Sequence, residues 1–282
     1  MGYSIEQIIQ QVGELPPLPQ AAQKALSLIR DPNSNMVDIS NALVVDQVMT
    51  SLVLRWANSA YYGLRNPVST VQQAVTYLGQ NTIQSLVLAA SVASFLDRPV
   101  PGYALDRGDL WKHAIGVAAG ARIVASRKGQ KIAEEAYHAG LLCDIGKLAF
   151  EVLLRNAQIA TNEWQGRPFN DLETYYFGVD HASLGAEMAR RWNLPASLQQ
   201  TIAFHHHPSD AGENAPLAAA VHIADAAVMT LGIGIGRDGL QYNFDPAALE
   251  MWGWTETDQV GLFDRIQGMV HDAEGFIGLT RR

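Results

Sequence analysis

Two aspartates in the second half of the chain are set among apolar residues. Asp144 lies in the run GLLCDIGK, and Asp225 lies in AAVHIADAAVMT. Burying an uncompensated carboxylate is costly, so each aspartate needs a partner. Carboxylate and imidazole groups are common ligands of divalent iron, manganese, zinc and nickel. These positions therefore raise the hypothesis of a metal site that uses nearby histidines.

Four histidines have positions that suit such a site. His113 follows Asp109 by four residues, which places both on one helix face. His181 begins a segment whose inward face continues through apolar and small residues, and His205 and His206 are consecutive. Metal sites are often built inside helical bundles from side chains on different helices. The sequence thus predicts that these histidines and the two aspartates converge.

Each of these residues also has a simpler explanation. A lone inward histidine is commonly a hydrogen-bonded core residue, and we assign His138 and His207 to the core or the surface. Asp144 and Lys147 can form an ordinary i,i+3 ion pair, and Asp109 can cap a helix. Spacing alone therefore suggests a cluster without identifying one.

Helical periodicity extends through almost the whole chain, and it predicts an all-α fold. Ile5, Ile8, Ile9 and Val12 show the i, i+3, i+4, i+7 spacing of one helix face. One helix is expected to end at Gly79 and another to begin at Thr82. In the second half we expect helices over 109–126, 132–156, 181–194, a stretch before 205, 216–231 and 255–270. These helices must position the polar residues.

The segment DRPVPG (97–102) is the best candidate for a join between two domains, because proline and glycine interrupt helices. It predicts an N-terminal helical subdomain over 1–98 and a second helical domain with a C-terminal helical tail over 99–282. The alternative is a loop within one domain. We also expect Trp56 and the NSAYYG turn after it to wedge against the second half.

Composition excludes several classes of protein. The chain has 282 residues, a formal charge of −8 and a pI of about 5.4, which argues against nucleic-acid binding. A single cysteine rules out an internal disulfide and fits a reducing cytoplasm. No apolar run is long enough for a membrane span, and no secretory signal is apparent. We predict a cytoplasmic protein without membrane association.

The glycine-rich stretch GIGIGRDG (232–239) resembles a phosphate-binding loop only in composition. It follows no predicted strand, and no Lys-Ser/Thr pair comes after it, whereas such motifs have meaning only in that context. We predict a flexible connector.

The ordered motifs resemble a known family. WKHA, GLLCDIGK, FGVDHASLGAEMARRWNLP, HHHP and VHIADAA follow one another as in the HD superfamily of metal-dependent phosphohydrolases, and most closely as in its HDOD branch. The N-terminal half agrees through LPPLPQAAQKALSLIRDP, VVDQVMTSLVLRWANSAYYG and VSTVQQAVTYLGQNTIQSLVLA. The likeness extends from about residue 8 to residue 231.

The resemblance implies roles for particular residues. His113, Asp144 and Asp225 match the ligands of one metal ion, and Asp144 would bridge to a second ion held by His181, His205 and His206. Asp109 stands where some two-metal relatives place a glutamate. Lys147 matches a lysine that contacts the substrate phosphate. The resemblance therefore implies one or two ions of iron, manganese, zinc or nickel.

Cys143 departs from the family pattern, because the superfamily has a histidine immediately before the aspartate. A cysteine thiolate can bind zinc or iron. The alternative, which we favour, is a small buried residue left after catalysis was lost, since free cysteine is among the most buried residue types.

The resemblance implies a signalling or regulatory HDOD module that is catalytically impaired, still holds a metal ion and binds a protein partner in a bacterial pathway. The alternative is an active metal-dependent phosphohydrolase or phosphodiesterase acting on a nucleotide or phosphate ester. A third hypothesis is a sensor that binds a nucleotide without turnover. No GYP signature follows HHHP, which argues against hydrolysis of cyclic di-GMP.

Overall fold

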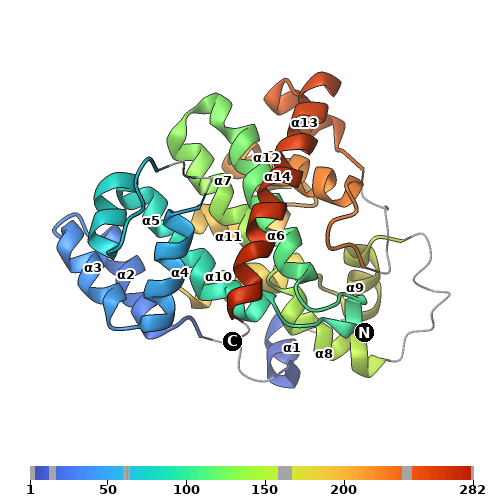
Figure 1. The fold of residues 1–282 in the computed structure, drawn as a ribbon. Helices are drawn as coiled ribbons and strands as arrows, with labels where there is room; N and C mark the ends of the chain where they lie inside the picture. Colours follow the sequence, from blue (N-terminus) through green and yellow to red (C-terminus); the bar gives the residue numbers. More distant parts are fainter. Residues whose placement is uncertain are drawn as a thin grey trace. The chain divides into compact units, whose positions relative to one another are not determined.

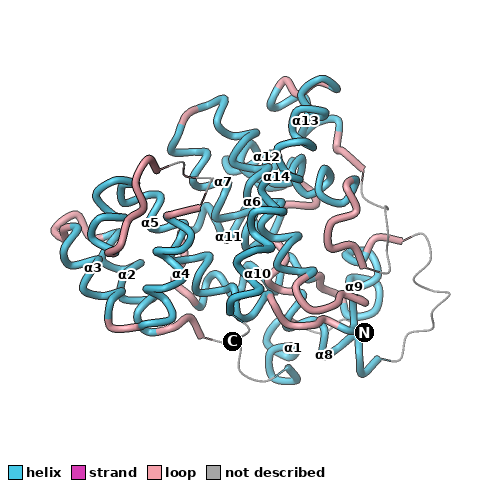
Figure 2. The backbone as a smooth tube through the Cα atoms, viewed as in Figure 1, coloured by secondary structure: helices cyan, strands magenta, loops and turns pink. Residues whose placement is uncertain are grey.

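The computed structural model is all-α, as the periodicity predicts. It describes residues 4–12, 17–59, 62, 64–157, 167–236 and 243–280. Within these ranges the chain forms helices joined by turns and loops, and the only strand-like pairing is the isolated bridge between Val100 and Leu105 (Figure 2). None of the helices in these ranges combines the length and apolar character needed to cross a bilayer.

The chain divides into two compact units. The larger unit contains residues 1–16 and 95–271, and the smaller contains 17–94 and 272–282. The division predicted from the sequence, into domains 1–98 and 99–282, remains a prediction. All the candidate ligands lie in the larger unit.

The smaller unit contains α2 (Gln20–Arg30), α3 (Met36–Val44), α4 (Gln47–Ala57) and most of α5 (Val71–Leu96). Asn35 caps α3 in a reciprocal capping box with Asp38, which satisfies amide groups at the helix start. Gly79 has a φ of 80° and interrupts α5 where the sequence predicts a helix end. Trp56 is buried. Its predicted wedging stays a prediction, and residues 60, 61 and 63 of the adjoining turn lie outside the described residues.

The helices of the larger unit surround a pair of almost fully buried helices, α6 and α12. A Cβ placed on Gly120 of α6 would lie 2.9 Å from the Cβ of Ala224 on α12, so small residues permit this close approach. Helix α7 packs against both, as Figure 1 shows. The bounds are α1 (Ile5–Val12), η1 (Pro101–Tyr103), α6 (Asp109–Ala125), η2 (Ser126–Lys128), α7 (Gln130–Leu142), α8 (Lys147–Ala157), α9 (Phe169–Phe177), α10 (His181–Arg191), α11 (Ala196–Phe204), η4 (Pro208–Asn214), α12 (Ala215–Thr230), α13 (Pro246–Trp252) and α14 (Glu256–Thr280).

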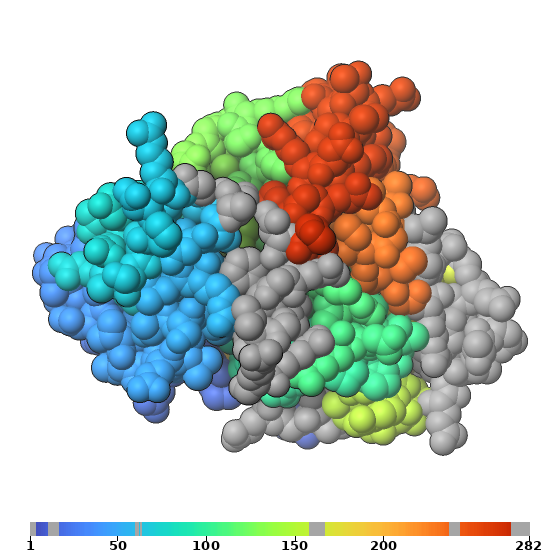
Figure 3. All heavy atoms as spheres, viewed as in Figure 1, coloured from blue at the N-terminus to red at the C-terminus, as the bar shows by residue number. Residues whose placement is uncertain are grey.

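Helix α13 and the part of α14 up to residue 271 complete this unit. Ile266 and Val270 of α14 contact the small-residue face of α6 at Gly116 and Gly120. Arg127 of η2 forms an ion pair with Asp258. In the space-filling view, the red surface of the C-terminal helices lies directly beside the orange surface of the preceding part of the chain (Figure 3). The predicted amphipathic helix over 255–270 thus covers α6.

The prediction of one continuous helix over 132–156 is wrong. Helix α7 ends at Leu142 and α8 begins at Lys147, with a turn of four residues between them. The turn packs against the start of α10, where a Cβ on Gly146 would lie only 1.9 Å from the carbonyl oxygen of His181. This backbone contact places Asp144 beside α10. A continuous helix through residue 146 would not bring the two backbones together at this point.

The glycine-rich segment after α12 is more than a connector. Gly234 has a φ of +62°, and a Cβ there would lie 2.4 Å from the carbonyl oxygen of Asp109. A Cβ on Gly236 would lie 2.3 Å from the carbonyl oxygen of Tyr103. Gly234 and Gly236 therefore pack closely against α6 and η1, contacts that the prediction of a flexible connector did not include. Residues 237–239 lie outside the described residues.

His138 of α7 is a buried core histidine, in line with its assignment above. Burial lowers its pKa to about 4, with Arg122 contributing in the same direction and Glu134 opposing. The unfolded chain, whose histidine pKa is about 6.5, takes up this proton first. Stability should therefore be fully present above about pH 6.5 and decrease as the pH falls towards 4, with a loss from this residue of about 3 kcal/mol at pH 4.

Urea unfolding at pH 7 and pH 4.5 tests this expectation. His138→Gln should lose less stability over the interval than the wild type does. The exposed His271, changed to glutamine, is the matched control for removing a histidine. An equal loss in wild type and His138→Gln would contradict the prediction.

Candidate metal centre

Asp144 lies at the meeting point of two groups of candidate ligands. One group joins it with His181, His205 and His206, and the other joins it with His113 and Asp225. Within each group the ligand atoms all lie within 4.8 Å of one another. The structure thus brings together the six residues that the sequence suggested as a cluster, from α6, the α7–α8 turn, α10, the end of α11 and α12.

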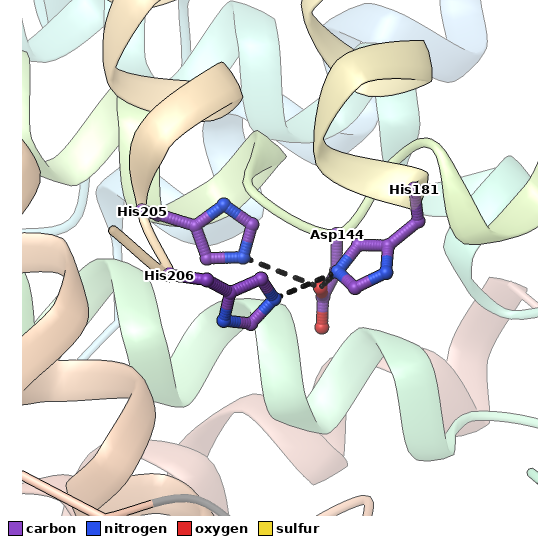
Figure 4. Close-up of side chains that lie close together, drawn as sticks. All are labelled: Asp144, His181, His205 and His206. Carbon is purple, nitrogen blue, oxygen red and sulfur yellow. Dashed lines mark hydrogen bonds and ion pairs between the residues drawn. The ribbon is translucent and has the colours of Figure 1, made fainter. Parts of the chain in front are cut away.

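The histidine-rich group converges on one carboxylate oxygen. Figure 4 shows the rings of His181, His205 and His206 directed towards Asp144. The Nε2 atoms of His181 and His205 lie 3.2 and 3.9 Å from Asp144 Oδ1. The Nε2 atom of His206 lies 3.0 Å from that of His181. Three imidazoles and one carboxylate therefore share a small buried volume.

The second group uses the other side of the same carboxylate. His113 Nε2 lies 3.2 Å from Asp144 Oδ2 and 2.9 Å from Asp225 Oδ1. His206 Nδ1 lies 4.0 Å from Asp225 Oδ2 and connects the two groups. One histidine thus faces two buried aspartates, an arrangement that brings two negative charges together.

The outer nitrogens of three histidines are held by oxygen acceptors. The Nδ1 atoms of His113 and His205 lie 3.1 and 2.8 Å from the carbonyl oxygens of Ile233 and Ile202. His181 Nδ1 lies 2.7 Å from a carboxylate oxygen of Glu173. Carbonyl and ionised carboxylate oxygens only accept hydrogen bonds, so these Nδ1 atoms carry the proton. Their Nε2 atoms are left to face the centre, as in metal-ligating histidines.

Charges within the cluster are mutually compensated. Burial by itself lowers the pKa of His113, but the hydrogen bond to Asp225 and the charge of Asp144 outweigh it and raise the pKa. Burial also opposes protonation of His181, whose pKa the charge of Glu173 and the bond to Asp144 raise to about 10. These two rings hold a proton where a metal ion would otherwise supply the positive charge.

The aspartates show the complementary shift. Burial would raise the pKa of Asp144, but Lys147 and the neighbouring histidines hold it well below its usual range. Burial would also raise the pKa of Asp225, but the hydrogen bond to His113 and the charge of that ring together lower it. Both carboxylates are therefore ionised and suited to bind a cation.

One ring nitrogen of His205 has no hydrogen-bond partner in the cluster. Its Nε2 atom is buried and has no hydrogen-bond partner among the described residues. Burial lowers the pKa of His205, so the ring is neutral. Its lone pair faces Asp144 Oδ1 at 3.9 Å, and two acceptors cannot satisfy each other. The buried, unpaired Nε2 atom of His205 is suited to bind a metal ion, because coordination would satisfy its lone pair.

Lys147 begins α8 directly beside the centre. Its Nζ lies 2.8 Å from Asp144 Oδ2 and 5.7 Å from the centroid of the Tyr103 ring. The pair has the i,i+3 spacing that the sequence suggested, although Asp144 lies on a turn. The phosphate contact implied for Lys147 stays a prediction.

Asp109 and Cys143, the two weaker candidates, belong to neither group. The carboxylate of Asp109 accepts a hydrogen bond from the backbone N–H of Asp106 at 2.9 Å, in keeping with a local role at the start of α6. The thiol of Cys143 donates to the carbonyl oxygen of Gly140 at 3.2 Å. Burial, with the charge of Asp144, raises the thiol pKa well above its usual range.

Replacing Cys143 with alanine should leave metal binding unchanged, because the neutral thiol is directed to Gly140 rather than to the cluster. The cost should be limited to stability, at about 1 kcal/mol, a typical value for a point substitution. Metal content after equilibration with Mn²⁺ and a thermal melt measure the two effects. A metal content that falls in Cys143→Ala would instead identify the sulfur as a ligand.

Two hydrogen-bonding contacts of the candidate centre were not predicted from the sequence. Glu173 is fully buried on α9 and bonds to His181, and the backbone carbonyl of Ile233 bonds to His113. Glu173 and His181 lie on two different helices, α9 and α10, so their separation of eight residues does not place them on one helix face. A backbone carbonyl carries no sequence signal at all. Neither contact was therefore accessible without the tertiary structure.

The chain resembles three solved proteins throughout most of its length. One from Geobacter sulfurreducens, described as an HDOD domain protein with unknown function, is 24% identical with a TM-score of 0.69, and the match covers 98% of this chain and 94% of that one. One from Shewanella amazonensis SB2B, provisionally described as a phosphohydrolase, is 26% identical with a TM-score of 0.65 and covers 92% and 97%. One from Marinobacter aquaeolei VT8, provisionally described as a signal transduction protein, is 23% identical with a TM-score of 0.73 and covers 98% and 61%.

Family membership follows from the sequence comparison. An uncharacterized protein of Treponema pallidum (strain Nichols) is 28% identical over 229 residues, which are 79% of this chain. The match spans 44% of that curated relative, so the relative is the much longer protein. The family model of the HDOD domain matches residues 15–208, which are more than half of the chain. The chain therefore belongs to the HDOD domain family.

Proposed function

We propose that this chain is a bacterial regulatory HDOD module that holds one or two divalent metal ions around Asp144 and passes a signal to a protein partner. In this proposal its hydrolytic activity is impaired. Membership of the HDOD family supports the regulatory role. The nitrogen and oxygen donors of the centre suit iron, manganese, zinc or nickel.

The observation that carries the metal proposal is the buried Nε2 atom of His205, which has no hydrogen-bond partner among the described residues. It lies in a group with three other donor atoms. His181, His205, His206 and Asp144 would hold one ion, and His113, Asp144 and Asp225 a second. A divalent cation at such a position supplies Lewis acidity towards phosphate oxygens.

Impaired hydrolysis is proposed because of Cys143. The residue stands where the superfamily has a ligand histidine, and its thiol bonds to Gly140 instead. A centre short of one ligand binds its ion less tightly, and even outer-sphere losses cost about 10–100-fold in affinity or activity. The proposed module therefore retains the ligand cluster with reduced catalytic support.

An active phosphohydrolase or phosphodiesterase is the second candidate. Lys147 lies beside Asp144, where its ammonium group can neutralise part of a phosphate charge. The relative from Shewanella amazonensis, at 26% identity and near-complete coverage, is provisionally described as a phosphohydrolase. In this case the substrate would be a nucleotide or another phosphate ester.

The proposed partner is a protein, and a nucleotide is the proposed small ligand. A net charge of −8 disfavours nucleic acid, whose phosphates require a basic surface. A cytoplasmic location and the absence of membrane association remain predictions.

Elemental analysis of protein purified without added metal, combined with a hydrolysis screen, separates the two candidates. The screen should include p-nitrophenyl phosphate, its bis-ester, nucleotides and cyclic dinucleotides, each with Mn²⁺ or Fe²⁺. We expect bound metal and at most weak hydrolysis. Robust turnover that disappears in Asp144→Asn would favour the enzyme, whereas protein that cannot be loaded with metal would overturn the metal centre.

A further inference from the structure

Glu173 is a carboxylate that the proposed centre does not use as a ligand. It lies on α9 and is fully buried. Its Oε2 accepts hydrogen bonds from the backbone N–H and from Nδ1 of His181, both at 2.7 Å. Its Oε1 accepts from the hydroxyl of Tyr103. We infer that Glu173 is a positioning residue that orients His181 for metal binding, an inference that rests on the metal centre proposed above.

The hydrogen bonds determine which nitrogen of His181 faces the centre. A backbone N–H can only donate, so Glu173 Oε2 is an acceptor, and Nδ1 of the same residue donates to it. The Nε2 atom is thereby directed to Asp144 Oδ1, 3.2 Å away. A carboxylate bonded to the far side of a ligand histidine fixes the ring and increases its basicity. Glu173 bonds to the side of the His181 ring that faces away from Asp144, as such a carboxylate does.

The carboxylate is itself held in place from the other side. Tyr103 is fully buried, and its ring packs against Phe169 of α9 with centroids 4.6 Å apart. Close packing of Gly236 on the Tyr103 carbonyl further restrains this residue. Because η1 and α9 both contribute, the position of Glu173 is determined before any ion binds. Preorganisation of this kind is what a precise ligand site needs.

Helix capping alone does not account for Glu173. The side chain of Asp180 already caps α10 by accepting from the backbone N–H of Ser183 at 2.8 Å. Burying a second carboxylate at the same helix start costs free energy unless further hydrogen bonds compensate its charge. The bond to Nδ1 of His181 is the contact that reaches the centre.

Two variants of Glu173 and one control test the inference. Glu173→Ala removes the acceptor, and Glu173→Gln retains an acceptor oxygen without the charge. Glu134→Gln is the matched control, since Glu134 is also buried, bonds to Arg122 and Gln130, and belongs to neither ligand group. It measures the cost of neutralising a buried carboxylate elsewhere in the unit.

The first measurement uses metal-free, ¹⁵N-labelled protein. The Nδ1 proton of His181 should give a downfield, slowly exchanging NMR signal in wild type and Glu134→Gln, and this signal should be lost in Glu173→Ala. The test does not depend on metal, so it stands even if the proposed centre fails. Persistence of the signal in Glu173→Ala would overturn the inference.

The second measurement is titration with Co²⁺, followed by its visible absorption. Affinity should fall about 10–100-fold in Glu173→Ala and less in Glu173→Gln, the range seen when such outer partners are removed. An equal loss in Glu134→Gln would assign the effect to general destabilisation and overturn the inference. If wild-type protein binds no Co²⁺, the metal role of Glu173 fails together with the proposed centre, while the NMR signal still reports its contact with His181.

Discussion

Changing Asp144 to asparagine is expected to abolish metal binding in both ligand groups. Its Oδ1 faces His181 and His205, and its Oδ2 faces His113, so the amide would remove the charge that the two groups share. Loss of outer partners alone costs about 10–100-fold, so loss of a bridging ligand should weaken binding by about 100-fold or more. Metal content after dialysis against limiting Mn²⁺ measures the change.

Asp225→Asn is the matched control for this experiment. Asp225 contributes to the group with His113 and is absent from the group with His181, His205 and His206. We therefore expect Asp225→Asn to retain one ion where Asp144→Asn retains none. Equal metal content in wild type and Asp144→Asn would rule out Asp144 as the shared ligand.

Asp144→Asn should also lower stability, which must be measured alongside. Lys147 Nζ lies 2.8 Å from the carboxylate and would lose its anionic partner. Breaking a buried ion pair by removing one partner costs about 3–5 kcal/mol. Urea unfolding of the metal-free proteins separates this loss from the loss of metal, because only the former persists without metal.

Changing Gly146 to alanine should destabilise the protein by more than about 4 kcal/mol, an exceptional value for a single substitution. The new Cβ would lie 1.9 Å from the carbonyl oxygen of His181 and 2.6 Å from the backbone nitrogen of Gly185. Both atoms belong to the backbone of α10, so no side-chain rotation relieves the clash. The α7–α8 turn would have to separate from α10, and Asp144 would move away from His181.

Gly261→Ala is the control for this substitution. Gly261 lies in α14, where a Cβ would have no heavy atom within 4 Å outside the residues of its own helix turn. Alanine is favoured over glycine in a helix by up to about 1 kcal/mol, so this variant should be neutral or more stable. Denaturant melts of both variants and the wild type decide the matter. A Gly146→Ala protein with wild-type stability would contradict the close backbone contact.

Several features of this protein could be predicted from local sequence patterns. The apolar periodicity of segments such as 216–231 predicts helices, and Gly79 predicts an interruption that the structure contains. Asp225 could be singled out because a carboxylate within an apolar helix needs a compensating partner. These inferences hold because helix periodicity and the cost of burying charge depend on neighbouring residues and composition alone.

Other features depend on contacts between residues far apart in the chain. The break between α7 and α8 is invisible in an apolar run, because it arises from the approach of Gly146 to the backbone of α10. The role of the glycines after α12 likewise depends on their packing against Asp109 and Tyr103.

The same distinction between local patterns and long-range contacts applies to the candidate centre. The sequence alone determined which candidate ligand types are present, their order along the chain and the apolar surroundings of Asp144 and Asp225. Only the tertiary structure decided that Asp144 serves both groups, that the Cys143 thiol is directed away to Gly140, and that Glu173 supports His181. Side-chain direction and hydrogen-bond partner are set by how separate helices pack, and spacing within one segment does not encode that packing.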